Sequence, residues 1–199
     1  MKKIYFASFL LISMVYGNQY STAQQSFRLV PTNSSMTIEG TSSLHDWEMN
    51  VEKLSCLLNA TVGNPSMSIQ SVTFTAESSS ISSHSSLMDS KAHDALKTKK
   101  YPEIRFRITS SLKVPVKDGS FQGIAEGELT LAGITRKISL PYKGKIAGKD
   151  NITITGSEKI DMTEYDIEPP TAMLGTLKTG KEVVISFSLD LKQLQTSMH

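Results

Sequence analysis

The stretch MDSKAHDALKTKKYPEIRF, residues 88–106, differs from the rest of the sequence because its apolar residues repeat with the period of a helix. Positions i, i+4, i+7 and i+8, which share one helical face, are occupied by Met88, Ala92, Ala95 and Leu96. Ser85 or Ser86 can cap the start, and Pro102 prevents continuation. We therefore predict one short amphipathic helix at Met88–Lys97, with its apolar face on the open end of a barrel.

Around this helix, apolar and polar residues alternate with period two, which is typical of half-buried strands. The alternating segments are 27–30, 35–41, 44–51, 53–62, 69–77, 103–114, 121–131, 137–146, 151–162 and 182–191. Tight turns such as Lys117–Gly119 favour antiparallel connections, and a twisted sheet of this size either closes or splits. We expect an all-β fold, an antiparallel up-and-down lipocalin-like barrel of about eight strands. A β-sandwich is the alternative.

The N-terminus has the pattern of a secretory signal peptide. Two lysines precede an apolar run, Ile4–Tyr16, and small residues follow at Ser21–Ala23. The run is too short to span a bilayer comfortably, which disfavours a retained membrane anchor. We predict a signal peptide over residues 1–23 and one mature domain over 24–199, periplasmic or secreted and not an integral membrane protein.

Charge and cysteine content exclude several classes of protein. Removing Lys2 and Lys3 from the 21 basic residues leaves 19, equal to the 19 acidic residues. A neutral mature chain argues against nucleic acid as a partner. Cys56 is the single cysteine, so no intramolecular disulfide is possible. Because it lies in an alternating apolar run, we expect a buried, unreactive thiol.

No motif for catalysis or cofactor binding occurs in the sequence. It contains no nucleophile elbow, zinc-protease motif or Gly-rich phosphate loop. Four possible metal ligands lie near one another, His84, Asp89, His93 and Asp94, but proximity in sequence alone does not make a site. His45 beside Asp46 is a possible base without an identifiable nucleophile, or simply a hydrogen-bonded residue at a strand start. We predict no catalytic residues, no metal and no cofactor.

Three motifs carry a resemblance to a known family. They are GTSSLHDW at 40–47, YPEIRF at 101–106 and GELTLAGIT at 127–135, with a weaker match at 175–178. In order and spacing they resemble the YceI-like family, secreted bacterial lipocalin-like proteins that bind polyisoprenoid lipids. The resemblance covers roughly residues 27–191. The chain departs at Glu164–Ile167, where many relatives have an Asp-Phe-Gly step.

The resemblance implies a long apolar lipid, polyisoprenoid or isoprenoid quinone, bound inside the barrel without catalysis and transported or sequestered. Independently, nine residues lie on the apolar faces of their strands and would converge on the interior: Trp47, Met49, Phe74, Phe106, Leu129, Leu140, Ile154, Ile185 and Phe187. Small residues at Gly123, Ala125 and Gly127 indicate a cavity, or else a strand bend or closely packed neighbours. The alternative function is a structural or adhesion module with a packed, ligand-free core. The oligomeric state is left open, a dimer included.

Overall fold

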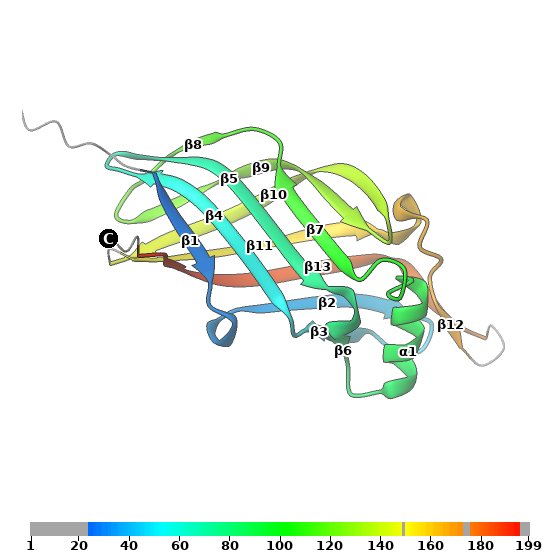
Figure 1. The fold of residues 1–199 in the computed structure, drawn as a ribbon. Helices are drawn as coiled ribbons and strands as arrows, with labels where there is room; N and C mark the ends of the chain where they lie inside the picture. Colours follow the sequence, from blue (N-terminus) through cyan, green and yellow to red (C-terminus); the bar gives the residue numbers. More distant parts are fainter. Residues whose placement is uncertain (1–23, 149, 173–175, 196–199) are drawn as a thin grey trace, which may run out of the picture.

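The alternating segments form a closed antiparallel barrel in the computed structural model, which describes residues 24–148, 150–172 and 176–195 (Figure 1). The first strands are β1 (Gln25–Leu29), β2 (Ser35–Ser42), β3 (Trp47–Val51), β4 (Leu54–Val62), β5 (Ser66–Glu77), β6 (Ile81–Ser82) and β7 (Glu103–Ile108). The remaining strands are β8 (Leu112–Pro115), β9 (Ser120–Leu131), β10 (Ile134–Ala147), β11 (Asn151–Asp161), β12 (Thr171–Ala172) and β13 (Leu177–Gln193). Pairing of β1 with β13 closes the sheet, so the barrel is confirmed and the sandwich alternative is wrong.

The barrel has eight strands in cross-section because several short strands lie end to end. β1 and β2 both pair with β13, with Leu29 opposite Leu191 and Ser35 opposite Ser188. The short helical turns η1 (Pro31–Asn33) and η2 (Ser78–Ser80) separate β1 from β2 and β5 from β6. β3 and β4 follow one another along β2 and β1, as β7 and β8 do along β5.

Two strand predictions differ from the structure. The expected strand 103–114 is divided into β7 and β8, and at the break both the N–H and the hydroxyl of Thr109 donate to the carbonyl of Glu126. β13 begins at Leu177 rather than Glu182. A register shift between Thr179 and Val183 interrupts its alternation, so the first residues of this strand carry no period-two signal.

The helix α1 (Ser86–Ala95) lies at one end of the barrel, beside β3, β6 and β12 (Figure 1). The Ser85 hydroxyl accepts a hydrogen bond from the Met88 N–H at 3.4 Å, which fixes the start. Lys97 adopts a positive φ of 54°, which ends the helix before the predicted boundary. The predicted apolar face packs against the barrel core.

The barrel end opposite the helix is closely packed. Five of its side chains are at most 1% exposed and do not line the apolar cavity of the opposite half: Phe27, Ala60, Met67, Ile152 and Leu191. Phe121 meets Tyr142 edge to face, with ring centroids 6.2 Å apart. We call this region the packed end. The half of the barrel on the helix side we call the hollow end.

The pairing of β10 explains why the two ends differ. β10 pairs with β9 along nearly its whole length, but its ladder with β11 starts only at Tyr142, opposite Gly156. The preceding residue is Pro141, which has no N–H to donate; its carbonyl faces Gly156, so its nitrogen also faces β11. Toward the helix the two strands no longer pair. The turn η3 (Met162–Tyr165) lies against β10 and β13 there.

Candidate functional site

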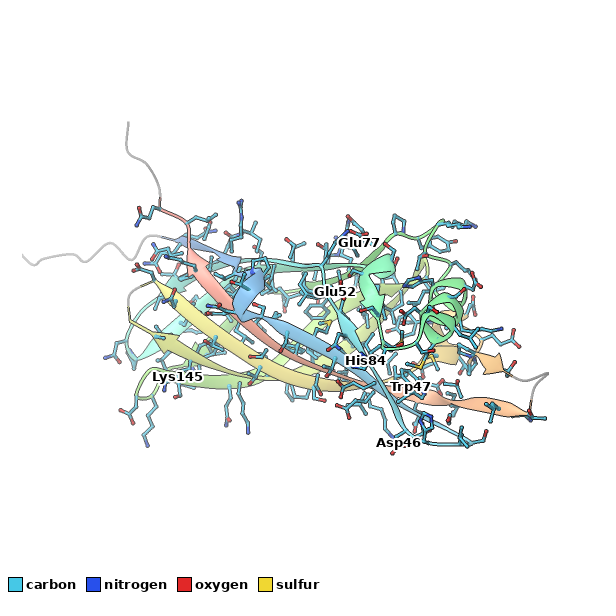
Figure 2. All side chains as sticks on the ribbon, turned by 90° about the horizontal axis from the view of Figure 1, so that it is seen from below. Asp46, Trp47, Glu52, Glu77, His84 and Lys145 are labelled. Atoms are coloured by element: carbon cyan, nitrogen blue, oxygen red, sulfur yellow. The ribbon has the colours of Figure 1, made fainter. Side chains whose placement is uncertain are left out.

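The hollow end contains a cavity of about 400 Å³ with an almost entirely apolar lining. Its exposed lining residues are Leu44, His45, Ser85, Leu87, Lys91, Thr171 and Lys178. They lie in the β2–β3 connection, in α1 and its N-cap, and in β12 and the start of β13, so the cavity opens at the helix end. We call these seven residues the mouth. Figure 2 shows Asp46, Trp47 and His84 in the same half of the barrel as the helix, and Lys145 toward the other end.

All nine residues predicted for the barrel interior line this cavity. Four are buried, namely Met49, Phe74, Phe106 and Leu129. Five are half-buried, namely Trp47, Leu140, Ile154, Ile185 and Phe187. The half-buried residues share the inward strand face with the buried ones, so the surface they leave uncovered faces the cavity. Contact of these nine residues with a lipid stays a prediction.

Trp47 is held in place at the edge of the cavity. Its indole N–H donates to the carbonyl of Thr41 at 3.1 Å, and its ring covers Gly40, where a Cβ would overlap it. In the same hairpin, His45 Nδ1 lies 2.6 Å from the backbone carbonyl of Asp46. His45 therefore contacts a main-chain group rather than a carboxylate. This matches the interpretation of a hydrogen-bonded residue at a strand start.

The small residues of β9 do not create the cavity by themselves. A Cβ on Gly127 would overlap the Phe106 ring, and one on Gly123 would lie 2.9 Å from the Tyr142 hydroxyl. Rings from the neighbouring strands thus fill the space above both glycines, as the close-packing interpretation predicted. Ala125 does line the cavity.

The sequence did not identify several lining groups. The helix face was predicted to cover the barrel end, and Met88, Ala92, Ala95 and Leu96 line the cavity itself. Met162 and Ile167 also line it, from an irregular segment without periodicity. Glu158 was missed because an acid is normally assigned to solvent. Its position in the alternation of Ile154, Gly156 and Ile160 does place it on the inner face.

Residues considered for metal or nucleophilic chemistry have structural roles. His93 Nε2 lies 2.8 Å from the Ile81 carbonyl, and the Asp89 carboxylate accepts bonds from the N–H and hydroxyl of Ser83, both at 2.7 Å. The described part of the chain has no group of three or more His, Cys, Asp or Glu placed to hold a metal. Cys56 is 2% exposed, and burial raises the pKa of its thiol to about 12.

These features define a class of protein. A closed eight-stranded antiparallel barrel, open at one end and hollow with apolar walls, is the architecture of a lipocalin-like binding protein. Within the described residues, no helix is both long and apolar enough to cross a bilayer. The family model of the YceI-like domain matches residues 27–191, and the chain belongs to this family.

Solved structures share the fold. A polyisoprenoid-binding domain from Saccharophagus degradans, implicated in plant cell wall breakdown, has a TM-score of 0.65 at 14% identity, covering 84% of this chain and 98% of that one. BcnA of Burkholderia cenocepacia has a TM-score of 0.60 at 15% sequence identity, and the match covers 81% of this chain and 98% of BcnA. The YceI protein of Campylobacter jejuni has a TM-score of 0.55 at 17% sequence identity, and the match covers 74% of this chain and 85% of that protein. No curated protein gives a significant match.

Proposed function

We propose that this protein binds a long apolar lipid, of polyisoprenoid or isoprenoid-quinone type, and transports or sequesters it without catalysis. The observation that carries the proposal is the apolar cavity of the hollow end, open to solvent beside α1. Membership of the YceI-like family and the polyisoprenoid-binding neighbour from Saccharophagus degradans support the same ligand class.

The size and lining of the cavity suit such a ligand. Its volume of about 400 Å³ lies in the lower part of the range for small-molecule sites. Each Å² of apolar ligand surface removed from water contributes roughly 25 cal/mol. A chain longer than the cavity extends through the mouth, where the exposed side chains of Leu44 and Leu87 offer apolar contact. The alternative function, a structural or adhesion module, requires a filled interior, and the cavity of the hollow end does not support it.

The first experiment is native mass spectrometry of freshly purified protein, followed by lipid extraction. We expect a co-purifying isoprenoid in the wild type and its loss in Leu129→Glu, because the new carboxylate lies on the cavity wall. The control is Lys143→Glu, which places the same charge on the outer face of β10. A wild type that neither carries nor takes up isoprenoids, or a folded Leu129→Glu that still carries them, contradicts the proposal.

We further propose that the protein acts in the periplasm or outside the cell after export. The support is the signal-peptide pattern of residues 1–23, which lie outside the described part of the structure. N-terminal sequencing of the exported protein is expected to start at Gln24. An intact Met1 in the functional protein contradicts export by cleavage.

A further inference from the structure

One buried polar atom, which belongs to a residue of the cavity wall, has an unusual position. Tyr142 lines the cavity from β10, and its side chain is only 8% exposed. Its hydroxyl is buried and has no hydrogen-bond partner within the described residues. Buried polar groups in native proteins are nearly always paired, because leaving one unpaired costs free energy. The missing partner is therefore expected to come from whatever occupies the cavity.

The surroundings hold this hydroxyl in a fixed place. The Tyr142 ring packs edge to face on Phe121, which belongs to the packed end, so Tyr142 forms the floor of the cavity. Its hydroxyl oxygen lies over Gly123, and a Cβ added to this glycine would lie only 2.9 Å from that oxygen. A phenylalanine would fill the same space with the ring alone. Packing therefore explains the ring, and the hydroxyl needs a separate explanation.

A second polar group on the inner wall restricts the charge of the occupant. Glu158 of β11 lines the cavity, opposite Ile185 of β13. Burial raises the pKa of this carboxyl, and its negative form opposes an anion in the same apolar space. The cations of the lining, Lys91 and Lys178, are instead exposed at the mouth. An anionic head group is favoured only there.

We infer that the ligand enters with its head first and places a neutral oxygen, a hydroxyl or a carbonyl, as the acceptor for the Tyr142 hydroxyl at the cavity floor. Its apolar chain then runs toward the mouth between α1 and the β2–β3 connection. Lipids with phosphate or carboxylate heads bind less well in this orientation. This inference rests on the proposed lipid binding and adds the chemistry of the head group and the direction of the ligand.

The test uses delipidated full-length mature protein and three probes with the same isoprenoid chain: farnesol, farnesene and farnesyl phosphate. Trp47, the only tryptophan, lines the cavity and reports binding by fluorescence. We expect wild type to prefer farnesol over farnesene by roughly three- to tenfold, the range of one hydrogen bond. Farnesyl phosphate should bind more weakly than farnesol.

Tyr142→Phe should remove the preference for farnesol while binding farnesene at least as well as wild type. The matched control is Tyr101→Phe, because Tyr101 packs on Gly133 outside the cavity lining. It should keep the preference. Glu158→Gln should tighten farnesyl phosphate specifically.

Two failures are distinguishable. Equal wild-type affinity for farnesol and farnesene, or a farnesol preference that survives in Tyr142→Phe, overturns the head-first inference and leaves lipid binding intact. Absence of binding for all three probes refutes the proposed function itself. The wild-type comparison needs no variant, so it decides the inference even if Tyr142→Phe fails to fold.

Discussion

The packed and hollow ends of the barrel are built from the same long strands, yet only one of them is filled. β11 contributes Ile152 to the packed end, where it is completely buried, and Ile154 to the cavity wall, where it is half-buried. In the same way, β13 contributes the completely buried Leu191 to the packed end and the half-buried Ile185 to the cavity wall. Between the two residues of each pair, the apolar alternation is unchanged. What changes is the pairing, because β10 and β11 separate beyond Pro141.

This comparison shows what an apolar inner face does and does not determine. It determines which side of each strand is buried. Whether the enclosed space is full depends on how closely opposite walls approach and on which rings reach across. At the packed end Phe121 covers Gly144, whereas at the hollow end Phe187 covers Gly156 and still borders the cavity.

The largest expected effect separates the two ends by stability. Leu191→Ala should lower the free energy of unfolding by about 2–5 kcal/mol, because a fully buried side chain leaves a void in close-packed surroundings. Leu140→Ala removes the same atoms from a half-buried position on the cavity wall and should cost only about 1 kcal/mol. Urea unfolding of delipidated protein measures both. Equal losses would mean that the hollow end is filled in solution.

The second prediction concerns the contact between Gly127 and Phe106. Gly127→Ala should destabilise the protein by about 1–3 kcal/mol and weaken lipid binding, since the added methyl would overlap the cavity-lining Phe106 ring and lie 2.7 Å from the Arg107 carbonyl oxygen. Gly63→Ala is the control, because its Cβ would meet only the Ser66 carbonyl, at 3.1 Å.

A double substitution tests whether the overlap with the Phe106 ring causes the loss in Gly127→Ala. Adding Phe106→Leu to Gly127→Ala should recover part of the loss, so the two substitutions should be non-additive. Additive losses would show that the methyl acts on something other than the ring.

Much of this architecture was predictable from the sequence, because strands and helices leave different periods in the spacing of apolar residues. Period-two alternation identified the inner faces, so the nine candidate residues lie on the cavity wall. Four apolar positions and a serine cap located α1. The cavity's shape was not predictable, because it depends on the absence of β10–β11 pairing before Tyr142 and on the irregular segment holding Met162 and Ile167. Neither leaves a periodic signal.

The third prediction asks whether the hollow end is as dry as the packed end. Cys56 lines the cavity, yet burial raises the pKa of its thiol from an ordinary value of 9.0 to about 12. Above pH 9 the unfolded chain loses this proton while the folded protein retains it. Stability should therefore fall between about pH 9 and pH 12, by up to about 1.4 kcal/mol per pH unit. Cys56→Ala should remove this part of the slope.

Thiol labelling gives an independent measurement at neutral pH. A buried, neutral thiol should react with a disulfide reagent only after opening of the barrel, so labelling should be slow and slower still with lipid bound. Fast labelling of the native protein would show that water and reagent reach the cavity wall freely.

The smallest expected effect concerns the end of β11 beside η3, which we call the rim, where exposed polar contacts replace core packing. Asp161 ends β11 and caps η3: its carboxylate accepts hydrogen bonds from Thr163 and pairs with Lys181 at 2.7 Å. The Lys181 hydrogen bond is the main cause that lowers its pKa to about 2. A lowered folded-state pKa stabilises the protein above the unfolded value near 4 and loses this effect as the pH falls toward 2. Because the pair is solvent-exposed, Asp161→Asn should shift the unfolding midpoint only slightly at pH 7.

The pH dependence makes this small effect informative. The difference between wild type and Asp161→Asn should shrink between pH 4 and pH 2, because protonation abolishes the same charge in the wild type. High salt should reduce it as well. A difference that persists unchanged at pH 2 would mean that the aspartate acts through its shape as a cap. The rim beside the β10–β11 separation would then be held by local backbone geometry rather than by charge.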